Sequence, residues 1–149
     1  MQVLKRIEQG FDLLLPLAPI LVSLQNQWIP THLLLGISAC GAIIHLFWAL
    51  VSPRTWKYHP MQEQWSAQQT FQFKLFQLSA ALSWIAVLTF SGGEGSSAFS
   101  YTVILLLAAL IPFFIRPAAQ SKTYPSKSLL VRSVLIAFTN LLLLILTRG

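Results

Sequence analysis

The chain has 149 residues, of which 55% are hydrophobic and only 9% are charged. Soluble domains carry about 25% charged residues, so these charges are too few to cover a surface that faces water. The many Leu, Ile and Phe residues exclude an intrinsically disordered chain. A single cysteine, Cys40, excludes an internal disulfide framework and a cysteine-rich zinc site. We therefore expect an all-α, polytopic integral membrane protein.

Five segments are candidates for crossing a membrane, which takes about 20 mostly apolar residues each. The first, at 11–24, is shorter and contains Pro16 and Pro19, so it spans only if the helix extends through 25–29 or inward before Phe11. We predict one transmembrane domain, 1–149, folded as a bundle of about five helices, with four helices as the alternative. The expected spans are 11–29, 33–51, 71–90, 98–115 and 129–147.

The basic residues are unevenly distributed if all five segments cross. Nine of the ten Lys and Arg residues then lie on the side of the N-terminus, and only Arg148 lies on the other. The nine are Lys5, Arg6, Arg54, Lys57, Lys74, Arg116, Lys122, Lys127 and Arg132. Cytoplasmic flanks of membrane proteins carry such an excess, so we expect a cytoplasmic N-terminus and a C-terminus across the membrane. These residues suit anionic lipid head groups, whereas charges spread over membrane flanks do not form a nucleic-acid recognition patch.

A signal peptide is a second interpretation of the N-terminus. The basic pair Lys5 and Arg6 precedes an apolar run at 13–24, which is the arrangement of such peptides. The cleavage site after this run lacks the small residues that processing requires. We therefore expect an uncleaved first span.

Small residues in the second and third spans indicate close helix packing. In the second span Gly36 and Cys40 are four residues apart, as are Ser38 and Ala42. Small residues at this spacing allow two helices to approach closely in a membrane. The third span carries Ser79 and Ser83, and we expect it to pack against the second.

His45 and Gln77 are the most specific polar pair. Each lies six residues from the inner end of its span, or about 9 Å deep at 1.5 Å per residue. The simpler interpretation is an interhelical hydrogen bond, worth about 0.6 kcal/mol on average in membrane bundles. The other is a cofactor site, in which the pair faces a quinone or His45 is the axial ligand of a haem or chlorophyll. Neither His32 nor His59 lies at the depth of His45 on another helix, which disfavours a bis-histidine haem.

Other polar residues inside the expected spans are candidates for helix association or transport. Asn140 lies near the midplane, where an interhelical hydrogen bond is favoured, and Lys74 can extend to the inner interface. Glu8 and Asp12 are four residues apart, and we expect an interfacial salt pair near Lys5 rather than acid–base catalysis. No two carboxylates on different helices form a catalytic pair or a metal site. The sequence therefore assigns no catalytic residue and no metal ligand.

These observations favour a small non-enzymatic integral membrane protein, an accessory or assembly subunit of a larger membrane complex. The first alternative is a quinone-, haem- or pigment-binding protein that uses His45 and Gln77. The second is a small transporter or channel that uses Lys74, His45 and Asn140. The loop at 52–70, which is rich in Trp and Gln, is expected to dock lipid or a neighbouring subunit. The identity of any cofactor is left open.

Overall fold

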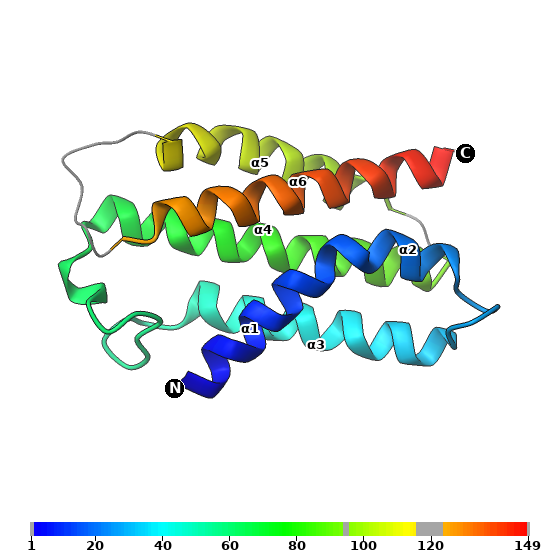
Figure 1. Cartoon of the computed structure of the whole chain (residues 1–149), viewed down its shortest axis with the longest axis horizontal. Coiled ribbons are helices and arrows are strands. Elements are labelled where there is room, and N and C mark those ends of the chain that lie inside the picture. Colours follow the sequence, from blue (N-terminus) through cyan, green and yellow to red (C-terminus); the bar gives the residue numbers. More distant parts are fainter. Residues whose placement is uncertain (1, 94–95, 116–123, 149) are drawn as a thin grey trace.

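The structure is a computed structural model of the whole chain, and it describes residues 2–93, 96–115 and 124–148, except the side chains of 147 and 148. These ranges contain helices and no strand, so the expected all-α bundle is confirmed (Figure 1). Four of the helices are long and apolar enough to cross a membrane. They are α3 (Thr31–Leu50), α4 (Ala67–Ser91), α5 (Ala98–Ile115) and α6 (Ser126–Arg148).

Each of these helices coincides with one expected span to within a few residues. The largest difference at a start is in α4, which begins at Ala67 rather than at 71. Ser66 and Gln69 form a capping box there, because the Ser66 hydroxyl accepts from the Gln69 backbone N–H and the Gln69 side chain accepts from the Ser66 backbone N–H. Two otherwise unpaired backbone donors are satisfied in this way, which extends the helix beyond its apolar part.

The first segment is a broken helix. It consists of α1 (Gln2–Leu14), the 3-10 turn η1 (Leu15–Leu17) and α2 (Ala18–Ser23). Pro16 and Pro19 lack a backbone N–H, so the regular hydrogen bonding of an α-helix is interrupted between α1 and α2. The expected extension through 25–29 is not helical, because the chain turns there and Asn26 adopts a left-handed φ of 70°. The helix instead gains its length on the N-terminal side.

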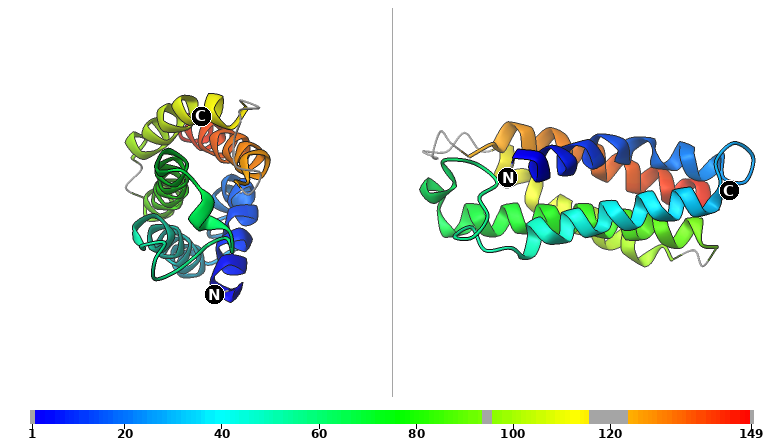
Figure 2. Two further views of the ribbon diagram at one scale, coloured as in Figure 1. Left: turned by 90° about the vertical axis from the view of Figure 1, so that its left-hand side faces the viewer. Right: turned by 90° about the horizontal axis from the view of Figure 1, so that it is seen from below.

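The two termini lie at opposite ends of the bundle (Figures 1 and 2). With α1, η1 and α2 taken as one traverse, the chain passes along the bundle five times. The end with the N-terminus also holds the connection from α3 to α4, whereas the turn at 24–30 lies at the other end. Two of the basic residues that we assigned to the N-terminal side, Arg116 and Lys122, lie outside the described residues.

The α3–α4 interface is built on small residues, as expected, but only in part on the ones predicted. Ser38, Ala42, Ser79 and Ser83 are buried. Gly41 permits the closest approach, since a Cβ atom there would lie 2.7 Å from the Trp84 ring. Gly36 and Cys40 are exposed instead, and a Cβ at Gly36 would meet nothing within 4 Å. Helix periodicity places these two on the outward side of α3, so their predicted packing role does not apply to this interface.

The connection between α3 and α4 folds back onto the bundle. It contains the short turn η2 (Gln62–Gln64), and it buries the rings of Tyr58 and Trp65. Tyr58 packs against Trp48 of α3 and Phe73 of α4, with ring centroids 5.1 and 4.7 Å apart. This segment is therefore part of the core at that end of the molecule, in addition to any contact it makes with lipid or another subunit.

Candidate functional site

A cluster of ionisable and amide side chains lies inside the bundle, and α1 contributes two carboxylates to it. The buried residues of this helix are Glu8 and Asp12, which are four positions apart and therefore on the same side. An ordinary amphipathic helix directs apolar residues inward. Burial of two carboxylates requires compensating groups from the rest of the fold.

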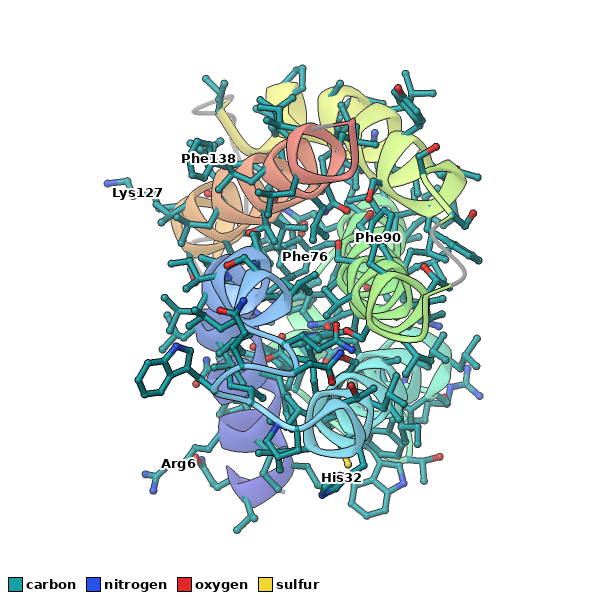
Figure 3. The ribbon with its side chains drawn as sticks, turned by 90° about the vertical axis from the view of Figure 1, so that its right-hand side faces the viewer. Arg6, His32, Phe76, Phe90, Lys127 and Phe138 are labelled. Atoms are coloured by element: carbon teal, nitrogen blue, oxygen red, sulfur yellow. The ribbon has the colours of Figure 1, made fainter. Side chains whose placement is uncertain are left out.

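Arg132 of α6 supplies the compensating cation. Its Nη2 donates to Glu8 Oε1 and its Nε donates to Asp12 Oδ2, while Nη1 donates to the Tyr58 hydroxyl over 3.1 Å. The guanidinium carbon also lies 4.8 Å from the centroid of the Phe76 ring. Phe76 points into the interior in Figure 3, whereas Arg6 and Lys127 point outward. Arg132 is therefore largely buried, with 11% of its side chain exposed, although the charge distribution predicted a basic flank of the last span.

Tyr58 connects the cluster to the α3–α4 connection. Its hydroxyl donates to Glu8 Oε2 over 2.7 Å, and its backbone N–H donates to Gln62 Oε1 over 2.8 Å. Burial raises the pKa of the Tyr58 hydroxyl, and the nearby Glu8 carboxylate raises it further, against an opposing effect of Arg132. Tyr58 thus remains protonated at neutral pH and acts as a hydrogen-bond donor to Glu8.

His45 and Gln77 are joined by the expected interhelical hydrogen bond. His45 Nδ1 and Gln77 Oε1 are 2.8 Å apart, and both side chains are fully buried. Gln77 Nε2 donates to Glu8 Oε1 over 3.2 Å, so the amide turns its oxygen toward the imidazole. An amide oxygen only accepts, so Nδ1 carries the hydrogen, and the neutral ring has its lone pair at Nε2. Among the described residues, Nε2 has no hydrogen-bond partner.

This tautomer restricts the cofactors that His45 can bind. A lone pair at Nε2 can ligate the metal of a macrocycle or accept from a quinol hydroxyl, but it cannot donate to a quinone carbonyl. A donated Nδ1–H is also the arrangement by which proteins orient metal-bound histidines. The Gln77 amide already uses its oxygen toward His45 and one N–H toward Glu8 within the cluster. The cofactor role that we predicted for His45 and Gln77 stays a prediction.

Glu8, Asp12 and His45 also form a set of metal-ligand type. One ligand atom from each lies within 4.8 Å of the other two, and all three residues are buried. Carboxylates and imidazole are common ligands of divalent cations. Arg132, however, is paired with both carboxylates. A divalent ion would have to displace a buried guanidinium, whose loss of partners is strongly unfavourable.

The remaining predicted polar residues lie apart from this cluster. Asn140 Nδ2 donates to Ser83 Oγ and to the Ile136 carbonyl, each over 2.8 Å, and thereby links α6 to α4. This is the interhelical hydrogen bond that its position near the midplane suggested. Lys74 is half-buried in the second turn of α4. The structure does not join Lys74, His45 and Asn140 into one hydrogen-bonded network within the described part of the chain.

The sequence predicted the hydrogen bond between His45 and Gln77 but not the ion pairs of Arg132 with the two carboxylates. We expected Arg132 at the membrane flank of the last span. We expected Glu8 and Asp12 in an interfacial salt pair near Lys5. One feature could have identified the carboxylates. The chain has only four Asp and Glu residues, and two of these lie four positions apart on one face of the first helix. Arg132 is the seventh residue of α6, whereas the predicted start of that span at 129 made it the fourth.

Comparisons of the chain with protein-family models, with curated proteins and with solved structures found no match.

Proposed function

We propose that the protein is an integral membrane protein with five traverses, and that it serves as a non-enzymatic accessory or assembly subunit of a larger membrane complex. The support for membrane insertion is the apolar length of α3 to α6. In the proposed orientation the end that carries the N-terminus faces the cytoplasm, because the start of α1 and the α3–α4 connection both lie at that end (Figure 1). These two segments carry Lys5, Arg6, Arg54 and Lys57. The same residues then meet anionic lipid head groups.

The use of the buried polar groups favours a structural role over catalysis. Glu8 and Asp12 are paired with Arg132, and Gln77 is hydrogen-bonded to both Glu8 and His45. These contacts fasten α1 to α3, α4 and α6. The paired groups of this cluster favour one arrangement of the helices, because each pair forms only when the helices that carry it are in register.

The exposed residues on the outward side of α3 support the proposal that the protein binds a partner subunit. Gly36 and Cys40 are exposed there, next to the exposed Leu33 and Ile43. Small residues four positions apart reduce the contact that a helix makes with lipid, but they let a second helix approach closely. We propose that this face, defined by Leu33, Gly36, Cys40 and Ile43, binds a transmembrane helix of another subunit.

The single cysteine makes this proposal directly testable. Cys40 lies within the proposed interface and is the only cysteine of the chain, so a reagent that attaches to its thiol and carries a short photoreactive arm can link this one position to a helix packed against it, whatever side chain faces it. We expect a defined crosslinked product on blue-native and denaturing gels, identifiable by mass spectrometry. The matched control is Leu105→Cys in a Cys40→Ala background, since Leu105 is 71% exposed on α5. Equal products from both positions, or none from Cys40, would contradict the proposal.

A second candidate function is supported by the free Nε2 atom of His45. A metal-centred macrocycle needs one axial nitrogen, and this atom has no hydrogen-bond partner among the described residues. The test is a visible absorption spectrum and an organic extract of protein purified from its native membrane. A bound pigment should disappear in His45→Gln and persist in His32→Gln, while an empty spectrum and extract would exclude this function.

A further inference from the structure

We propose that the end of the bundle that carries the N-terminus binds the phosphate group of one anionic phospholipid, with Lys5 and Lys57 as its cationic ligands. A cavity of about 190 Å³ lies at this end, lined by Gln2, Lys5, Lys57, Tyr58 and Pro60. The inference rests on the membrane orientation given under the proposed function. It deepens that function, because it assigns one bound lipid to one site in place of a general attraction to head groups.

Two segments that are far apart in the sequence build this cavity. The start of α1 contributes Lys5, and the α3–α4 connection contributes Lys57 and Tyr58. Tyr58 is a fixed wall of the cavity, because its ring is buried and its hydroxyl is hydrogen-bonded to Glu8 and Arg132. The cavity therefore depends on the packing of α1, α6 and the connection, and it is not the inside of a single surface loop.

The described residues that line the cavity carry two ammonium groups and no carboxylate. The Lys5 ammonium lies over the Tyr58 ring, 4.9 Å from the ring centroid. Glu8 attracts this ammonium, but the described residues show no ion pair between the two. An anion in the cavity would thus meet Lys5 without displacing a carboxylate from it.

Lys57 has a partner that an incoming anion can replace. Its ammonium pairs with Glu63, whose side chain is 75% exposed and lies outside the cavity lining. Ion pairs between solvent-exposed side chains contribute little to stability, since water and salt screen them. A phosphate group can therefore take the place of Glu63 beside Lys57 at small cost.

The size and chemistry of the cavity suit a phosphate group. Sites for drug-sized ligands measure about 300–1,000 Å³, so this cavity is too small for a whole ligand of that kind. It can hold a head-group phosphate while the rest of the lipid stays outside. Lysine binds phosphate as a point charge, and the Gln2 amide can add an N–H donor.

Exposed apolar residues at the same end favour a lipid as the source of the phosphate. Val3, in the first turn of α1, is 66% exposed, and Leu50, the last residue of α3, is 77% exposed. In the proposed orientation these side chains meet acyl chains. The polar head-group layer borders the acyl chains, so it lies at the level of the α3–α4 connection that carries Lys57. A phosphate at this level belongs to the anionic membrane surface.

The test counts the lipids that the full chain retains. Protein purified in neutral detergent with phosphatidylcholine is titrated with phosphatidylglycerol, and native mass spectrometry gives the number bound and the dissociation constant. We expect one phosphatidylglycerol per chain to bind more tightly than any further one. Inorganic phosphate added to the same titration should not displace it. Displacement by inorganic phosphate, or lipid binding without a first tight site, would overturn the proposal.

Four charge-removing variants separate a bound phosphate from diffuse attraction. Lys5→Gln and Lys57→Gln should each weaken the first site about ten-fold or more, because each removes a donor to a charged group. Arg6→Gln and Arg54→Gln are the matched controls, since they remove the same charge from the same two segments but do not line the cavity. Arg6 points outward in Figure 3. These controls should weaken binding at most about five-fold, the effect of one cation near an anionic surface. Equal losses in all four variants would overturn the proposal.

Glu63→Gln provides a test on an exposed side chain, which holds even if Lys5→Gln does not fold. It frees Lys57 from its partner, so phosphatidylglycerol should bind more tightly. The gain should disappear in Glu63→Gln/Lys57→Gln, whereas a diffuse effect of charge would persist there and overturn the proposal. Reporter domains at the two termini measure the orientation separately, and the Cys40 crosslink measures the partner. Failure of lipid binding is therefore distinguishable from failure of the proposed function.

Discussion

Arg132 and Asp12 are 120 positions apart in the sequence, yet Arg132 Nε donates a hydrogen bond to Asp12 Oδ2 inside the bundle. The contact joins the first helix to the last. Because Arg132 also pairs with Glu8 and Tyr58, one side chain links α1, α6 and the connection between α3 and α4. The first prediction concerns the removal of this link.

Replacing Arg132 by Met should destabilise the protein strongly, because two buried carboxylates lose their cation. We expect a loss of about 3–5 kcal/mol in the free energy of unfolding, the usual effect of removing one partner of a buried ion pair. Denaturant titration in detergent micelles measures it. The control is Glu8→Gln/Asp12→Asn/Arg132→Met, which leaves no unpaired charge and should recover most of the loss. Equal stability of Arg132→Met and wild type would show that the carboxylates do not depend on the guanidinium.

Gly41 should tolerate no side chain. Gly41→Ala places a Cβ 2.7 Å from the Trp84 ring, and such overpacking of a core costs about 1–3 kcal/mol. Gly36→Ala is the matched control on the same helix, where the added Cβ meets nothing within 4 Å. That control should leave stability unchanged or raise it by up to about 1 kcal/mol, because Ala favours helix more than Gly does. Thermal unfolding of the purified variants gives both values.

The Asn140–Ser83 hydrogen bond should make a small contribution to the free energy of unfolding. Interhelical hydrogen bonds in membrane bundles average about 0.6 kcal/mol and reach about 1.7 kcal/mol. A double-mutant cycle with Asn140→Ala and Ser83→Ala measures the coupling directly. We expect a coupling energy in that range, since Asn140 Nδ2 and Ser83 Oγ are 2.8 Å apart and both residues are buried. Additive losses would mean that the two side chains do not interact energetically.

Tyr58 should make the protein sensitive to alkaline pH. Tyrosine in the unfolded chain ionises near pH 10, and burial raises the pKa of Tyr58 above this value in the folded protein. The folded state therefore binds more protons than the unfolded state above about pH 10, and the free energy of unfolding falls as the pH rises through that window. Burial raises the pKa of Tyr124 too, so the comparison is made in a Tyr124→Phe background. There, Tyr58→Phe should flatten the alkaline decline of the melting temperature, and an unchanged slope would show that Tyr58 does not cause it.

The five traverses predict that the two ends of the chain lie on opposite sides of the membrane. Reporter domains fused to either end, or cysteines placed near either end in a Cys40→Ala background and probed with a membrane-impermeant reagent, measure this. We expect the N-terminus on the cytoplasmic side and the C-terminus on the other. Both termini on one side would mean that the broken segment made of α1, η1 and α2 does not cross.

The long helices could be predicted because their signal is local. A run of about 20 apolar residues specifies a helix whatever lies around it, since its backbone groups must be satisfied within the segment. The predicted starts of the four long helices therefore agree with the structure within four residues. The first segment was predicted less well, because Pro16 and Pro19 interrupt its pattern and its true start, Gln2, lies in a polar stretch.

The His45–Gln77 pair could be predicted for a similar reason. In antiparallel neighbours, equal distance from the same end brings two residues to equal depth, and this can be counted along the chain. The partner of a charged residue cannot be found by counting residues along the chain. Whether Arg132 faces lipid or the interior depends on the rotation of α6 about its axis and on which helix lies beside it.

The composition, the sparse charge and the apolar runs thus determined by themselves that the chain forms long helices fit to cross a membrane. They determined this because each run must satisfy its own backbone hydrogen bonds wherever it is placed. Only the tertiary structure decided which ion pairs the charged residues form. Lys57 pairs with Glu63 at the surface, and Arg132 pairs with Glu8 and Asp12 inside the bundle. An ion pair depends on distance and burial, which arise when η1 and α2 pack against α6 and bring α1 near it. The order of residues along the chain does not contain this information.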